Sequence, residues 1–245
     1  MKVTIDTQMR DILLSEAAKA RFTESRRDSI HVSDLLYCLR RSFFEKLGEE
    51  AEGDTKGNLT MMLGEAFQAW LLPGVEGAAF RVTYEGVVCT PDGIAVLESG
   101  ERVPLEIKST RTSSNKIPGY AYSGATLNHY VDQVATYCLS LGVTSGRIAV
   151  LYMSGDYRAN RDATLVVYAV AFSQEELERW ARIISHRQAL LLSAMQTGEP
   201  PPIDEHLPWA CGYCPYHEKL CPGSPGKWGQ NFSVDTEPWS EEEPE

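Results

Sequence analysis

The cysteines of this 245-residue chain are divided between its two ends. Three of the six lie within eleven residues, at Cys211, Cys214 and Cys221, and Cys38 stands 173 residues before the first of them. Four thiolates suit either a [4Fe–4S] cluster or a structural Zn²⁺ ion. A site built from all four would tie the beginning of the chain to its end, and this constrains every fold that can lie between them.

A second arrangement of the same segment stays open. His217 falls between the last two C-terminal cysteines, so these three cysteines and His217 suit a compact zinc site that leaves Cys38 as a buried thiol. Cys89 and Cys138 lie in apolar stretches and are predicted to be core residues. Three disulfides are not expected, because a chain of this length buries a sizeable core without such cross-links.

Composition and charge describe an intracellular globular protein. Apolar residues make up 43% of the chain, no stretch approaches the roughly 18 apolar residues of a membrane span, and the first residues lack an apolar signal core. We therefore expect a cytoplasmic protein without a membrane partner. The net charge is −11, but residues 231–245 hold six carboxylates and no lysine or arginine, so the body carries only −5. This acidic tail, 229–245, is predicted to be disordered.

The hydrophobic periodicity predicts a mixed α/β fold. Ser33 is expected to be the N-cap of the second helix, and Ser173 with Glu176 to form a capping box at the start of the last one. The expected helices are 6–21, 33–44, 59–72, 127–141 and 173–196. The expected strands are 80–88, 93–97, 103–109, 147–153 and 163–172.

Two carboxylates and a lysine, Asp92, Glu106 and Lys108, fall on the predicted hairpin 93–109 or directly before it. Glu106 and Lys108 should point to one face of their strand and Ile107 to the other, and the hairpin brings Asp92 alongside them. Two carboxylates with the Ile107 carbonyl would suit Mg²⁺ or Mn²⁺, and Lys108 would orient a bound water or neutralise developing charge. The simpler alternative is a surface strand with an ordinary Glu/Lys pair.

These residues resemble the RecB-like branch of the PD-(D/E)xK nuclease superfamily. That branch has a Gly-x-x-x-His helix, an Asp, a Glu-x-Lys strand and a helix with Gln-x-x-x-Tyr. Here Gln133 and Tyr137 supply the last motif, and the resemblance implies that they line the active site. The first motif departs from the pattern, because Gln68 stands where the family has a metal-ligating His. A glutamine carbonyl is still a hard-oxygen ligand, although an uncharged one.

The cysteines extend the resemblance to iron–sulfur nucleases. One N-terminal cysteine and three C-terminal ones around a RecB-like core are similar to the fourth CRISPR-associated protein family and the AddB type, and residues 32–41 are similar to the opening segment of the CRISPR-associated family. The resemblance implies a restriction-endonuclease-like core with a mixed central sheet flanked by helices. It also implies a [4Fe–4S] cluster, held by Cys38 and the three C-terminal cysteines, that joins the terminal segments.

The expected domains follow from this resemblance. They are an N-terminal helical region (1–75), a RecB-like nuclease core (76–200), the cysteine cluster (201–228) and the acidic tail. In the long loop 110–125, basic and aromatic residues are expected to contact DNA: Arg111, Lys116, Tyr120 and Tyr122. His129 would either approach the active site or serve a structural role.

Two functions are predicted from different classes. The first is a Mg²⁺- or Mn²⁺-dependent exonuclease that acts on single-stranded or unpaired DNA ends, in CRISPR spacer acquisition with integrase proteins or in recombination and repair. The second is a nuclease-fold DNA-binding adaptor with little catalysis, which the Gln68 departure and the acidic charge favour.

Overall fold

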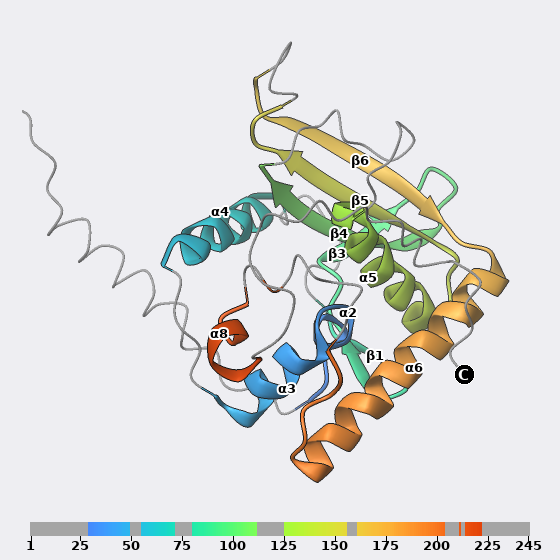
Figure 1. Ribbon diagram of the computed structural model, residues 1–245. Helices are drawn as coiled ribbons and strands as arrows, with labels where there is room; N and C mark the ends of the chain where they lie inside the picture. The colour runs from blue at the N-terminus through green and yellow to red at the C-terminus, as the bar shows by residue number, and fades with distance from the viewer. Residues whose placement is uncertain are drawn as a thin grey trace, which may run out of the picture.

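A four-stranded mixed sheet forms the centre of the protein in the computed structural model (Figure 1). The structure describes residues 29–49, 55–71, 80–111, 125–155, 161–203, 211 and 214–221. The strand order is β3-β4-β5-β6, in which β4 and β5 are parallel and the two outer pairs are antiparallel. The strands are β3 (Gly93–Val96), β4 (Arg102–Thr110), β5 (Ser145–Tyr152) and β6 (Thr164–Ala171).

The helices cover this sheet on two faces. Helix α5 (Ala125–Leu141) connects the parallel strands β4 and β5, as such a pair requires, and packs in the larger core with α6 (Gln174–Thr197). Helix α4 (Thr55–Leu71) packs on the opposite face, where Phe67 and Leu71 meet Leu105 and Ile107 of β4. The predicted α/β class with a mixed sheet flanked by helices is confirmed.

The remaining elements gather around α6. Helices α2 (Val32–Leu36) and α3 (Leu39–Leu47) share the larger core with α5 and α6, and α8 (His217–Leu220) lies beside α3 (Figure 1). The ring centroids of Phe44 on α3 and Tyr216 before α8 are 5.7 Å apart. Segments from the two ends of the described chain therefore lie in contact. No helix of the described residues combines the length and apolar character needed to cross a membrane.

Several predicted elements are confirmed at their ends. Ser173 Oγ accepts the Glu176 N–H at 3.1 Å and Glu176 Oε2 accepts the Ser173 N–H at 2.7 Å, which is the predicted capping box of α6. Helix α5 ends before Gly142, whose φ of 67° is the left-handed conformation that glycine favours. The predicted core positions Cys89 and Cys138 are both fully buried. The predicted helix 6–21 and the acidic tail lie outside the described residues.

Two predictions were wrong. The single strand 80–88 is a hairpin of β1 (Val82–Tyr84) and β2 (Val87–Cys89), because Glu85 and Gly86 both have positive φ and reverse the chain in a two-residue turn. The single helix 33–44, with Ser33 as its N-cap, is two helices. The first begins at Val32 and the second at Leu39, and extended backbone at Tyr37 separates them.

Helix α5 approaches the sheet where β5 carries Gly146. A Cβ atom on Gly146 would lie 2.3 Å from Val134 Cγ1 and 3.3 Å from the Pro104 carbonyl oxygen. Both distances are shorter than ordinary van der Waals contact. The missing side chain thus sets how close α5, with Gln133 and Tyr137, comes to β4.

We expect Gly146→Ala to destabilise the fold by about 1–3 kcal/mol, because the new methyl group overpacks the α5–sheet contact. Urea denaturation measures the change in the free energy of unfolding. In the Val134→Ala background the same substitution should cost less, since the clashing methyl group has been removed. Equal costs in the two backgrounds would show that Val134 does not set this distance.

Candidate active site

Asp92 and Glu106 meet where β3 begins beside β4. The backbone register pairs Gly93 with Leu105, so Asp92 stands next to the Glu106–Lys108 segment, as the hairpin predicts. Asp92 Oδ2 accepts the Ile107 N–H at 2.7 Å, and its Oδ1 accepts the side-chain amide of Gln68. The structure therefore brings together all four of the residues predicted to hold the metal.

The face of β4 that carries Glu106 and Lys108 is turned toward α5. Ile107 belongs to the apolar cluster under α4, on the other face, which is the predicted alternation. Glu106 is only 1% exposed and its carboxylate forms an ion pair with Lys108. Apart from this ion pair, neither carboxylate oxygen has a hydrogen-bond partner among the described residues. A surface Glu/Lys pair, the simpler alternative, does not describe this arrangement.

The charges of the site shift one another's pKa values. Burial raises the pKa of Asp92 to about 7, and repulsion from Glu106 adds to the rise. Burial alone would lower the pKa of Lys108, but attraction to Glu106 and Asp92 outweighs it, so the net shift is upward. Lys108 is therefore protonated at neutral pH and can stabilise negative charge, but it is a poor general base.

The residues of the Gln-x-x-x-Tyr motif reach the site from α5. Gln133 Nε2 donates a hydrogen bond to the Tyr137 hydroxyl, and that hydroxyl donates to the Thr90 carbonyl oxygen at 3.2 Å. Burial raises the pKa of Tyr137, and the nearby Glu106 carboxylate raises it further. The Tyr137 side chain is 1% exposed and therefore lies at the buried end of the site, whereas Gln133 is partly exposed.

A divalent cation is compatible with these groups. A dication would offset the repulsion between Asp92 and Glu106 and supply a second cationic partner for the buried Glu106 carboxylate, which forms an ion pair with Lys108. The described residues hold no group of three or more His, Cys, Asp or Glu side chains arranged for a metal. Mg²⁺ needs only one or two carboxylates from a protein, so the two present here are sufficient.

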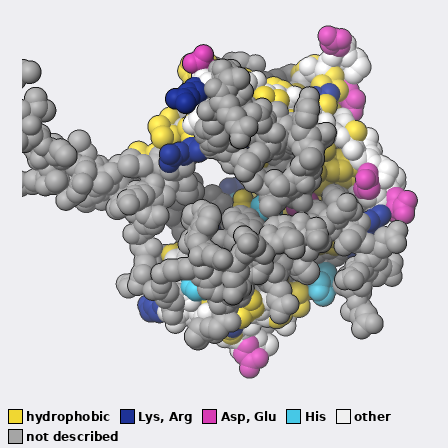
Figure 2. All heavy atoms as spheres, turned by 45° about the horizontal axis from the view of Figure 1, so that its top comes forward, with side chains coloured by type: hydrophobic (Ala, Val, Ile, Leu, Met, Phe, Trp, Pro, Cys, Tyr) yellow, Lys and Arg dark blue, Asp and Glu magenta, His cyan; other side chains and the backbone are white. Residues whose placement is uncertain are grey.

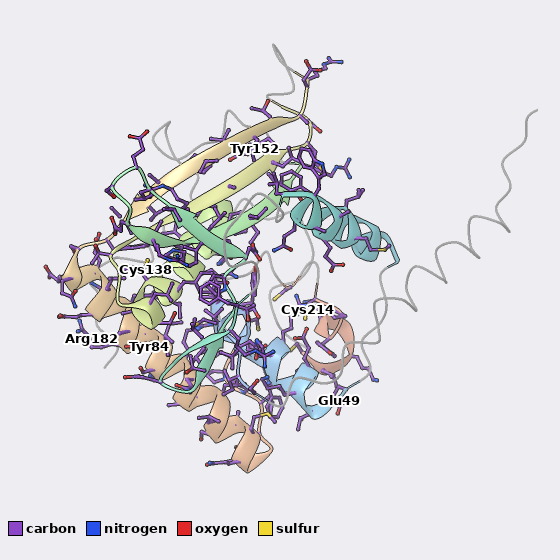
Figure 3. The ribbon with its side chains drawn as sticks, turned by 180° about the vertical axis from the view of Figure 1, so that it is seen from behind. Glu49, Tyr84, Cys138, Tyr152, Arg182 and Cys214 are labelled. Atoms are coloured by element: carbon purple, nitrogen blue, oxygen red, sulfur yellow. The ribbon has the colours of Figure 1, made fainter. Side chains whose placement is uncertain are left out.

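The four cysteines predicted to bind the second cofactor lie in one neighbourhood, beside α3 and α8. Burial raises the pKa of the Cys214 thiol, and the nearby Cys38 and Cys221 sulfurs add to the rise. Cys221 is affected in the same way by Cys38 and Cys211. Figure 3 shows Cys214 in this region, well separated from the core residue Cys138. The described cysteines nevertheless do not form a metal-binding group in this structure.

Sequence reasoning missed Tyr130, Asp132 and Arg187. The ring centroid of Tyr130 lies 5.6 Å from Lys108 Nζ. Its position one helical turn before Gln133 was the available signal.

His129 was predicted either to approach the active site or to serve a structural role, and its ring lies 5.3 Å from that of Tyr37. In the loop 110–125, Arg111 is exposed, and the other predicted DNA contacts lie outside the described residues.

Arg187 on α6 links α5 to the end of α2. It donates hydrogen bonds to the Leu35 carbonyl oxygen at 2.5 Å and to the Tyr37 carbonyl oxygen at 2.7 Å. Asp132 on α5 lies near this guanidinium group. Burial raises the pKa of Asp132 to about 7, although the attraction to Arg187 opposes the shift. The end of α2 is thus held from outside the helix, which explains why the chain stops being helical before Cys38.

The sequence profile of the PD-(D/E)XK nuclease superfamily matches residues 7–222. The chain belongs to this superfamily. No curated protein sequence matches the chain.

Similar folds are found among solved structures. The crystal structure of SSO0001 has a TM-score of 0.55 at 18% identity, over 89% of this chain and 97% of that one. An alkaline exonuclease from Laribacter hongkongensis has a TM-score of 0.49 at 15% identity, over 76% of this chain and 96% of that one. Its complex with dAMP has a TM-score of 0.46 at 16% identity, over 76% and 90%.

We predict that the stability of the protein depends on pH through Asp132. Its pKa is 3.8 in the unfolded chain and about 7 when folded, so the folded protein keeps this proton longer and loses stability as the pH rises between these values. Asp132→Asn cannot titrate. Between about pH 5 and about pH 8 it should lose less stability than the wild type, by on the order of 1–3 kcal/mol.

Urea denaturation at the two pH values measures this difference. Asp162→Asn, at an exposed aspartate, is the matched control and should follow the wild type. If Asp132→Asn and the wild type lose the same stability, Asp132 is already ionised in the folded protein.

Proposed function

We propose that this protein is a Mg²⁺- or Mn²⁺-dependent deoxyribonuclease. The observation that carries the proposal is the Glu106 carboxylate, which is 1% exposed, lies beside a second carboxylate and forms an ion pair with Lys108. A buried charge arranged in this way is costly, and a cation-binding active site gives a reason for keeping it. Membership in a nuclease superfamily supports the same reaction class.

Asp92 and Glu106 would hold the ion, with Gln68 and the Ile107 carbonyl as the further oxygen ligands. When bound, the ion lowers the pKa of a water ligand and polarises the phosphodiester. Lys108 stays protonated and stabilises the charge that develops on the phosphate during attack. Gln68 now donates its amide to Asp92, so its carbonyl oxygen would reach an ion only after the amide turns over.

The proposed substrate is single-stranded DNA or an unpaired DNA end, cleaved as by an exonuclease in the cytoplasm. On the face shown in Figure 2, the acidic side chains of the described residues stand apart around the rim and do not form one patch. CRISPR spacer acquisition with integrase proteins, or recombination and repair, is the proposed setting, and it rests on the sequence resemblance alone.

The adaptor remains the second candidate. Its supporting observation is Gln68, which stands in place of a histidine ligand and occupies one oxygen of Asp92. An adaptor would bind single-stranded DNA and leave it intact when Mn²⁺ is added.

We predict that Glu106→Gln and Lys108→Ala each lower the rate of DNA cleavage by about a hundredfold or more, because they remove a metal ligand and the cation beside it. The measurement is the release of labelled nucleotides from single-stranded DNA in Mn²⁺. Glu101→Gln, at an exposed position just before β4, is the matched control and should cleave like the wild type. A folded Glu106→Gln protein with the wild-type rate would exclude this site.

We also propose that Cys38, Cys211, Cys214 and Cys221 hold a [4Fe–4S] cluster that joins the terminal segments. The support is the mutual influence of the thiols on their pKa values and the contact between Phe44 and Tyr216, which brings the two segments together. The thiolates would supply four ligands, as such a cluster needs.

Protein purified without oxygen should be brown and hold about four irons per chain. Cys38→Ala should lose the iron and much of the stability, because metal binding of this kind is coupled to folding. Elemental analysis checks both, with Cys138→Ala as a control that keeps its iron. The zinc alternative predicts one zinc that survives Cys38→Ala and is lost in His217→Ala, and that result would end the cluster proposal.

A further inference from the structure

The ion pair of the candidate active site opens to solvent at its lysine end. The Glu106 side chain is 1% exposed, whereas the Lys108 side chain is 29% exposed. Lys108 is therefore the member of this ion pair that a phosphate can reach from solvent. The side chains around the Lys108 ammonium group are the ones that a substrate would meet first.

Two tyrosines lie near Lys108. The Tyr130 ring lies 5.6 Å from Lys108 Nζ, within the range of a cation–π contact. The phenol of Tyr37 is close enough to raise the pKa of both Lys108 and Tyr130, although burial is the largest influence on each. Tyr37 in turn contacts the His129 ring at 5.3 Å. Tyr37 and Tyr130 are only partly buried, so they combine aromatic surface with access to solvent.

The Tyr37 ring is positioned by its backbone. Its carbonyl oxygen accepts a hydrogen bond from Arg187, and its extended conformation separates α2 from α3. Tyr130 comes from α5, a separate element that is fixed against the sheet at Gly146. Two rings on separately anchored elements are arranged before any substrate binds, which lowers the entropic cost of binding.

We propose that Tyr37 and Tyr130 form a subsite for an unpaired nucleobase beside the scissile phosphate. The inference rests on the proposed nuclease function and names the part of the substrate that the site recognises. Lys108 attracts the phosphate, and the rings stack on the base of the same or the neighbouring nucleotide. A base inside a duplex is stacked on its neighbours and cannot enter. The subsite thus selects single strands and frayed ends without reading sequence, because every base has an aromatic face.

The test measures binding with cleavage switched off. Fluorescence anisotropy in EDTA, without a divalent ion, compares a labelled single-stranded oligonucleotide with a strand of the same length that lacks its bases. Tyr37→Leu keeps the apolar bulk and removes the aromatic face, and Tyr37→Phe keeps the face. Tyr84→Leu is the matched control, because Tyr84 lies on the β1–β2 hairpin, which hydrogen-bonds to α6 (Figure 3).

The wild type should bind the normal strand more tightly than the strand without bases. Tyr37→Leu and Tyr130→Leu should each bind the normal strand about tenfold more weakly and the strand without bases unchanged. Tyr37→Phe and Tyr84→Leu should behave like the wild type. Thermal melting confirms that every variant is folded, so that a loss of base-dependent binding is not a loss of structure.

Other outcomes overturn the subsite. The subsite proposal is wrong if Tyr37→Leu weakens the binding of both strands equally or of neither strand. It is also wrong if the wild type binds the two strands equally tightly. The nuclease proposal is tested separately by adding Mn²⁺. A wild type that shows base-dependent binding and never cleaves contradicts the nuclease function and leaves the subsite standing. A wild type that cleaves while Tyr37→Leu binds normally contradicts only the subsite.

Discussion

The buried pair of Glu106 and Lys108 is the interaction on which the rest of the site depends. A carboxylate that is 1% exposed is expensive to keep ionised, and among the described residues the cation that pairs with it is Lys108 on the same strand. Burial, with repulsion from Glu106 added, raises the pKa of Asp92 to about 7. The Asp92 carboxylate accepts hydrogen bonds from the Ile107 N–H and the Gln68 side-chain amide. Removing either member of the pair would leave an uncompensated charge, so fold and reaction are coupled at this point.

The packing of helix α5 places its motif residues beside this ion pair. Its Val134 packs against the bare backbone of Gly146, which lets Tyr137 reach the Thr90 carbonyl and stand beside Glu106. On the far side of the helix, Thr136 accepts a hydrogen bond from Trp180 Nε1 at 2.9 Å, so α6 holds α5 in register. The contacts that position the motif residues are therefore made by residues outside the motif.

The sequence predicted the structure correctly where strand alternation and hairpin pairing determine it. Alternation on the strand placed Glu106 and Lys108 on one face, and the hairpin placed Asp92 beside them. The break before Cys38 could not be predicted, because the residue that satisfies the end of α2 is Arg187, about 150 residues later. Tyr130 was missed for a related reason: helical spacing from Gln133 indicates its face of α5, but its partner, Lys108, lies on another element.

Arg187 also connects the two proposed centres of the protein. The Arg187 guanidinium donates a hydrogen bond to the carbonyl oxygen of Tyr37, whose side chain lies near Lys108. Tyr37 is directly followed by Cys38. A shift of the chain at Cys38 must therefore move the Tyr37 backbone or break its hydrogen bond to Arg187. Loss of the cysteine-bound cofactor would then disturb the approach to the carboxylates through this short connection, although Asp92 and Glu106 themselves are anchored elsewhere, on the β3–β4 hairpin.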